Sequence, residues 1–156
     1  MSNANLPEVA PKAALLPAWL RAMRPKQWVK NVLVLAAPVA AGRLFETPVL
    51  IATLWAFVGF SLVSASIYLI NDSRDIEADR LHPTKRFRPI AAGELSSNLA
   101  YVLAAITAAA AFAIGFWVAP LLGATLAYSL AWTLLVRRRN PFRPDLAGAL
   151  SENDSR

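Results

Sequence analysis

The 156-residue chain has no cysteine and only one histidine. The absence of cysteine excludes disulfides, thiol catalysis and zinc–thiolate sites. With His82 as the single imidazole, a histidine-based metal site or a serine–histidine triad is not expected. Charge is also scarce, at 17% of residues, whereas 56% are hydrophobic and the mean hydropathy is +0.42. This composition is too apolar for an ordinary soluble domain of this length and indicates an all-α integral membrane protein in the lipid bilayer.

Basic residues outnumber acidic ones by sixteen to ten, which gives a formal net charge of +6. Such a balance could indicate nucleic-acid binding. Here, however, the bases cluster beside long apolar segments, as the positive-inside rule describes for membrane proteins. We therefore expect no nucleic-acid partner.

The uncharged segments predict four transmembrane helices, at about 28–45, 48–70, 99–119 and 121–136. The first is the weakest, because Pro38 interrupts it. The 38 uncharged residues of Leu99–Val136 would form one helix of about 57 Å, nearly twice the hydrocarbon core of a bilayer. Pro120 is the expected break, and Ser96 or Ser97 is expected to cap the start of the third helix.

The distribution of bases predicts the topology. The segment up to Lys30, the loop 71–97 and the tail after Val136 hold five bases each, whereas the two remaining turns hold one or none. This places both termini and the loop on the cytoplasmic side of a multi-pass plasma-membrane protein. We expect a membrane domain over 19–136, flanked by disordered tails at 1–18 and 137–156.

The loop Asn71–Gly93 holds four of the ten acids and five of the sixteen bases, with aspartates first and a basic run after them. If the preceding helix continues to Arg80, Asp72, Asp75 and Asp79 lie within about 60° of one another on one face. Three close carboxylates repel, so a cation among them is expected. Oxygen ligands of this kind suit Mg²⁺ together with substrate phosphates. The alternative is a solvated loop between two membrane helices, which would have no need to sort its charges.

A basic run follows the acids in the same loop. Lys85, Arg86 and Arg88 are candidates to bind phosphate oxygens that a metal does not reach. Between the two groups, His82 and Pro83 indicate a turn, and we expect the histidine to pack or cap there. The metal side and the phosphate side of the predicted site are therefore adjacent in sequence.

Three segments resemble the UbiA-type intramembrane prenyltransferases, and more narrowly their decaprenyl-phosphate phosphoribosyltransferase branch. They read LRAMRPKQWVKN, YLINDSRDIEADRLHPTKRFRPIAAGELS and LAYSL, within Leu20–Leu130. The resemblance implies the first half of a nine-helix bundle. It also implies Mg²⁺ as the cofactor, bound by the catalytic residues Asp72 and Asp75, with Asn71 and Asp79 as further ligands or their neighbours.

The implied reaction transfers 5-phosphoribose from phosphoribosyl diphosphate to polyprenyl (decaprenyl) phosphate and releases diphosphate, in the synthesis of arabinan precursors for the cell envelope. The metal would neutralise the leaving diphosphate. The acceptor phosphate is already anionic, so no protein nucleophile is required. The expected phosphate-binding residues are Lys26, Lys30, Lys85, Arg86 and Arg88; membrane-interface snorkelling is the alternative for the two lysines of the first segment.

This sequence departs from the family pattern after Leu130, where no second aspartate-rich motif follows. We therefore expect a truncated chain that carries half of the site and needs a complementary carboxy-terminal half or a homo-oligomer for activity. Two further functions stay open. One is prenyl transfer from a prenyl diphosphate to an aromatic acceptor, and the other is a non-catalytic membrane fragment or assembly partner.

Overall fold

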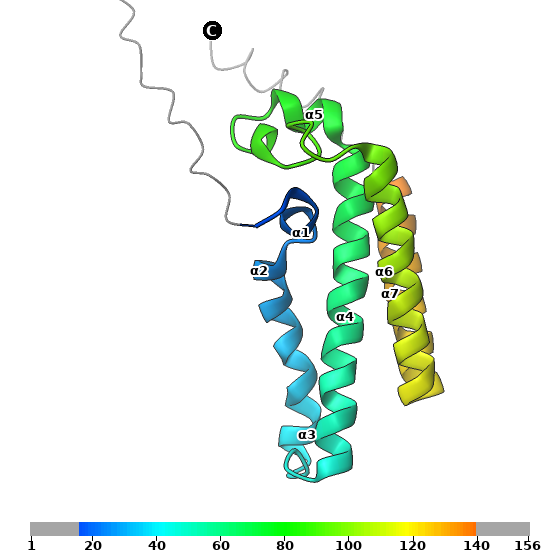
Figure 1. Cartoon of the computed structure of the whole chain (residues 1–156). Helices are drawn as coiled ribbons and strands as arrows, with labels where there is room; N and C mark the ends of the chain where they lie inside the picture. The colour runs from blue at the N-terminus through cyan, green and yellow to red at the C-terminus, as the bar shows by residue number, and fades with distance from the viewer. Residues whose placement is uncertain (1–15, 140–156) are drawn as a thin grey trace, which may run out of the picture.

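The computed structural model of the chain describes residues 16–139, and within them every regular element is helical. Both predicted tails lie almost entirely outside the described residues. Figure 1 shows a long central helix, α4, with shorter helical segments on one side and two further long helices on the other. In chain order the elements are α1 (Ala18–Ala22), α2 (Pro25–Trp28), η1 (Val29–Leu35), α3 (Ala36–Ala40), α4 (Thr47–Arg74), α5 (Ile76–Leu81), η2 (Lys85–Phe87), α6 (Ser97–Val118) and α7 (Pro120–Arg139).

Two helices, α4 and α6, are long and apolar enough to cross a membrane. Their 28 and 22 residues correspond to about 42 Å and 33 Å of helix. The start of α6 has the expected cap, because the Ser96 hydroxyl accepts a hydrogen bond from the Leu99 N–H at 3.3 Å. An uncharged run and a local capping rule were therefore sufficient to predict α6.

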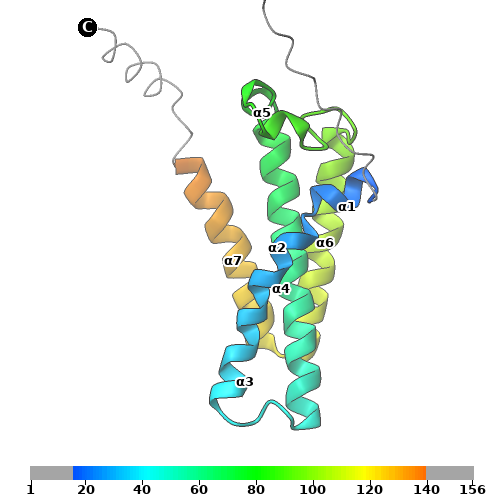
Figure 2. The ribbon, with the colours of Figure 1, turned by 90° about the vertical axis from the view of Figure 1, so that its left-hand side faces the viewer.

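The break between α6 and α7 lies at Ala119, whose backbone is extended, and α7 begins at Pro120. Proline is favourable in the first turn of a helix, where its missing N–H leaves no hydrogen bond unmade. The uncharged part of α7, Pro120–Val136, is shorter than α4 and α6. Figure 2 shows α7 close to α6 at this break and leaning away from α4 toward its carboxyl end.

The first predicted span is not a single α-helix. The chain is helical from Pro25 to Ala40, but its central seven residues, η1, wind as a 3₁₀-helix. This winding rises about 2.0 Å per residue, so the segment reaches about 28 Å instead of 24 Å. The segment runs beside α4 (Figures 1 and 2), and the Asn31 amide donates a hydrogen bond to the Ser61 hydroxyl at 3.2 Å. Four membrane crossings remain a prediction. Among the described helices, α4 and α6 have the length and composition for a crossing.

Small residues form the contact between α4 and α6. The buried side of α6 consists of Ala100, Ala104, Thr107, Ala111 and Gly115. Such residues allow two helix backbones to approach closely. The Ser66 hydroxyl of α4 donates to the Ala104 carbonyl at 2.9 Å across this contact, which adds a polar link between the helices.

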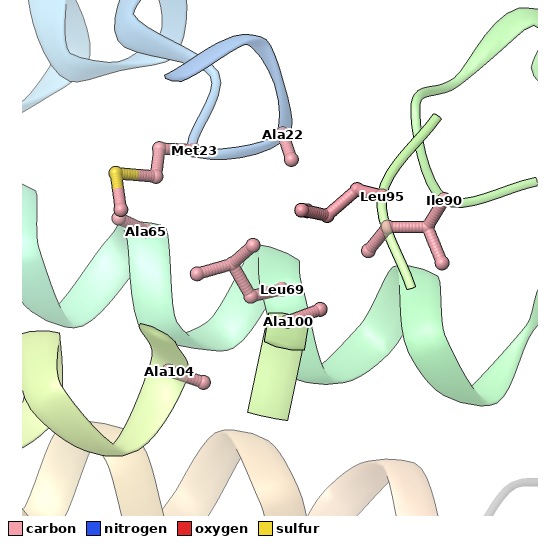
Figure 3. Packing of buried hydrophobic residues seen from close by; sticks show 8 residues of the cluster. All are labelled: Ala22, Met23, Ala65, Leu69, Ile90, Leu95, Ala100 and Ala104. Carbon is pink, nitrogen blue, oxygen red and sulfur yellow. The ribbon is translucent and has the colours of Figure 1, made fainter. Parts of the chain in front are cut away.

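A small apolar core lies where the motif loop meets α1. Figure 3 shows Ala22 and Met23, at the end of α1, facing Leu69 of α4, with Ile90 and Leu95 of the loop beside them. All five are buried. This core fixes the amino-terminal segment against the end of α4 that carries the aspartates.

Gly115 lies at the close contact between α6 and α7, and its replacement tests this contact. A Cβ atom there would lie 2.9 Å from the Gly123 Cα and 2.9 Å from the Leu126 Cδ1, so backbone would have to move. We expect Gly115→Ala to lower the free energy of unfolding by about 1–3 kcal/mol, measured by SDS titration in detergent micelles with tryptophan fluorescence. Gly59→Ala is the matched control, because its Cβ would approach only the flexible end of Leu126 tightly, at 3.1 Å, and would lie at an ordinary contact distance of 3.9 Å from the Ala111 carbonyl oxygen. Equal stability of the two variants would contradict the assigned α6–α7 contact.

Candidate functional site

The charged loop begins where α4 ends, and the helix does not continue to Arg80 as expected. It stops at Arg74, Asp75 has a non-helical backbone, and α5 begins at Ile76. Carboxylates are unfavourable near the carboxyl end of a helix and favourable near its amino end. The break places Glu77 and Asp79 in the first turns of a new helix. The prediction of one straight stripe of three aspartates is therefore wrong.

Asp72 is the buried acid at the end of α4, with 4% of its surface exposed. The Nη2 atom of Arg24 donates to both of its carboxylate oxygens, at 2.6 Å each. The same guanidinium lies over the Tyr68 ring, with its central carbon 4.7 Å from the ring centroid. Arg24 precedes Pro25, and its φ of 54° is the only positive φ outside glycine among the described residues. The amino-terminal segment thus supplies a cation directly to the first aspartate of the motif.

Arg88 connects two of the three predicted aspartates. Its Nη1 atom donates to Asp79 at 2.7 Å and to Asp72 at 3.2 Å. Asp79 is 3% exposed, so its carboxylate is removed from water almost completely. The cation that the clustered acids require is therefore, in this structure, a guanidinium of the same loop.

Two oxygen atoms of the residues that flank Asp72 in the chain lack partners. The Asn71 Oδ1 and the Ser73 Oγ are buried and make no hydrogen bond within the described residues. A buried acceptor without a donor is costly and often marks a site for an ion or a ligand. Asp75 is half-buried at the break. Across residues 16–139, no three Asp, Glu or His side chains converge closely enough to hold a metal ion. Oxygen donors of the kind that Mg²⁺ prefers are present, but Asp72 is bound to arginine.

The other predicted phosphate-binding residues have no acidic ion-pair partner in the described part of the chain. Lys26 in α2 and Lys30 in η1 are exposed, and Lys85 in η2 is half-buried. Arg86 is exposed, with its guanidinium 4.7 Å from the Phe87 ring centroid. None of the four takes part in an ion pair within residues 16–139, which leaves their charge available to an anion.

The remaining contacts hold the loop in place. Arg21 of α1 forms an ion pair with Glu94, just after Gly93, whose φ of 81° favours glycine. The Arg80 Nε donates to the Ala91 carbonyl at 3.2 Å. The His82 Nδ1 accepts from the N–H of Thr84 at 3.3 Å, a local turn contact of the kind expected for this histidine.

Sequence reasoning missed the role of Arg24, which was not among the predicted site residues. Its partner, Asp72, is 48 positions away, and no spacing rule reaches that far. The available signal was the X-Pro step at Arg24–Pro25, where the residue before proline is normally extended.

Within residues 16–139 the regular structure is helical, two helices are long enough to cross a membrane, and a buried ion-pair cluster lies at the end of one of them. The sequence matches the UbiA prenyltransferase family over residues 32–149, and the chain belongs to this family. Members of this family are membrane proteins, in agreement with α4 and α6.

Three relatives carry the name decaprenyl-phosphate phosphoribosyltransferase. The protein of Mycolicibacterium smegmatis is 47% identical over 135 residues, covering 84% of this chain and 42% of the relative. That of Corynebacterium glutamicum is 52% identical over 108 residues (68% and 32%), and that of Mycobacterium tuberculosis is 48% identical over 128 residues (80% and 42%). The chain therefore spans about two fifths or less of the length of these relatives.

Proposed function

We propose that this chain contributes the first aspartate motif of an enzyme that transfers 5-phosphoribose from phosphoribosyl diphosphate to polyprenyl phosphate. The observation that carries the proposal is the buried cluster of Asp72 with Arg24 and Arg88 at the end of a membrane-length helix. The 47–52% identity to the three phosphoribosyltransferases supports the choice of donor and acceptor.

Mg²⁺ is the proposed cofactor. The residues that would hold it are Asp72, Asp75 and Asn71, whose unpartnered Oδ1 lies next to Asp72 in the chain, while Asp79 stays paired with Arg88. When bound, the metal would neutralise the diphosphate that leaves C1 of the ribose. In the balanced step, the bond from C1 to the diphosphate oxygen breaks, a bond from C1 to an oxygen of the acceptor phosphate forms, and diphosphate is released.

The basic side chains have a separate role in the proposal. Arg88, already beside Asp72, is placed to orient the carboxylate and contact a phosphate oxygen. Lys85 and Arg86 on η2, with Lys26 and Lys30 on the facing amino-terminal segment, would bind further phosphate oxygens of donor or acceptor. Because the acceptor phosphate is an anion, these residues need only bind and align it.

The membrane arrangement is part of the same proposal. Four crossings would place both termini and the motif loop on the cytoplasmic face of the plasma membrane. The polyprenyl chain would lie along exposed apolar side chains such as Leu54, Val58 and Ile106. Since the chain spans about two fifths of its relatives, we propose that a carboxy-terminal half or a second copy completes the site.

A transfer assay tests this function. Membranes containing the chain, alone and with the carboxy-terminal part of a relative, receive labelled phosphoribosyl diphosphate, polyprenyl phosphate and Mg²⁺. We expect a labelled lipid that disappears when EDTA is added. A parallel reaction with a labelled prenyl diphosphate and an aromatic acid tests the alternative prenyl transfer. Product only in the parallel reaction would overturn the choice of donor, and product in neither would favour a non-catalytic chain.

A further inference from the structure

We propose that Arg24 is a positioning residue that occupies Asp72 until a divalent cation displaces it. This inference rests on the proposed function, because it concerns the carboxylate assigned to Mg²⁺. It goes beyond that function by assigning a role to a residue of the amino-terminal segment. It also predicts that this chain limits its own affinity for the metal.

Arg24 and a metal ion cannot occupy the same side of the Asp72 carboxylate. The Arg24 Nη2 lies 2.6 Å from each carboxylate oxygen, so it occupies the position between them. A Mg²⁺ ion bound at about 2.0–2.1 Å on this side of the carboxylate, the side between the two oxygens, would meet this nitrogen at far less than a contact distance. Two positive charges that close would also repel. The guanidinium must therefore leave this side of Asp72 when a metal binds there.

The surroundings of Arg24 allow its side chain to leave while the backbone stays in place. Its side chain is 25% exposed, so it is not enclosed on every side. The segment itself is held independently by the Arg21–Glu94 ion pair and by Ala22 and Met23, which are buried in the apolar core of Figure 3. Displacement of one guanidinium would therefore leave α1 docked against α4.

Tyr68 gives the displaced guanidinium a second contact. The ring already lies 4.7 Å from the Arg24 guanidinium carbon, within range of a cation–π interaction. From this position the arginine would keep its charge at the mouth of the site, where it can bind a phosphate oxygen. The backbone of Arg24 is left-handed, with a φ of 54°. In a residue other than glycine this conformation costs free energy, and it often occurs at functional sites.

Binding of Mn²⁺, used as the probe for Mg²⁺, tests this role without any turnover. Free Mn²⁺ is measured by electron paramagnetic resonance during titration of the purified full chain in detergent micelles. Removal of the competing guanidinium in Arg24→Gln is expected to tighten Mn²⁺ binding about tenfold, because a hydrogen bond between charged groups no longer has to be broken. Arg24→Lys keeps the positive charge as an ammonium group. Its Mn²⁺ affinity should lie between those of the wild type and Arg24→Gln.

Arg43→Gln is the matched control. Arg43 donates to Glu46 at 2.9 Å from both Nε and Nη2, but this pair is exposed in the turn between α3 and α4. Its loss should leave Mn²⁺ binding unchanged. Tighter binding in this variant would show a general charge effect and overturn the assignment to Arg24.

The outcomes separate the inference from the proposed function. Unchanged or weaker binding in Arg24→Gln, together with loss of binding in Asp72→Asn, would overturn the role of Arg24 and leave the metal site standing. Absence of Mn²⁺ binding in the wild type and in Arg24→Gln would overturn the proposed metal site, and the inference with it. Circular dichroism of each variant confirms that the helices are retained.

Discussion

Replacement of Arg88 by methionine is expected to lower the free energy of unfolding by about 3–5 kcal/mol, because it leaves a buried carboxylate without its cation. Arg88 is the hydrogen-bond partner of Asp79, which is 3% exposed. Asp72, the second partner of Arg88, keeps its contact with Arg24 and should suffer less. The measurement is SDS titration of the purified chain with tryptophan fluorescence as the signal.

Two further variants identify the cause of this loss. Arg43→Met breaks the exposed pair with Glu46, which holds the pKa of Arg43 above its ordinary value, and should leave the free energy of unfolding nearly unchanged. The double variant Arg88→Met/Asp79→Leu removes both partners of the buried pair and should recover most of the stability. A double variant as unstable as Arg88→Met would show that packing of the arginine stem, and not the unpaired carboxylate, causes the loss.

Asp72→Asn is expected to weaken Mn²⁺ binding by more than about 100-fold and to abolish transfer. Loss of a residue that only orients a metal ligand typically lowers metal affinity about 10–100-fold. Loss of a direct ligand should lower it further. Asparagine has nearly the same shape as aspartate, so loss of charge is the main change. The measurements are the Mn²⁺ titration and the lipid-product assay described above.

Glu77→Gln is the control for this change, because it also converts an acid of the motif loop into an amide. The Glu77 side chain is 86% exposed, and its pair with Arg80 lies in solvent. We expect no measurable change in metal binding or transfer. Mn²⁺ affinity within tenfold of the wild type in Asp72→Asn would contradict the assignment of this residue as a ligand.

Local patterns predicted the long helices well. The uncharged runs located α4 and α6, the serine before Leu99 located the cap of α6, and Pro120 located the start of α7. Each of these features depends on residues within a few positions of one another, so the local sequence is sufficient to predict it. The 3₁₀ winding of η1 was not predicted, since an apolar run is compatible with either helix type.

The cluster itself depended on contacts that no local pattern contains. The sequence showed that the acids need a cation, but Mg²⁺ was the only candidate considered. Arg24 and Arg88 lie 48 and 16 positions from Asp72, and they meet it because α1 packs on the end of α4 and the loop folds back. The break at Asp75 was not predicted either, and the Asp79 that follows it is paired with Arg88, nine positions further along the chain.

The small-residue side of α6 has a consequence for how this sequence can diverge. Larger side chains are disfavoured at Ala100, Ala104 and Ala111, because each of these residues is buried against neighbouring helices. The opposite side of the helix carries exposed Val102, Ile106 and similar residues, whose only requirement is to be apolar. In a set of homologues, α6 should therefore show a strict alanine and glycine register on one side and free exchange among large aliphatic residues on the other.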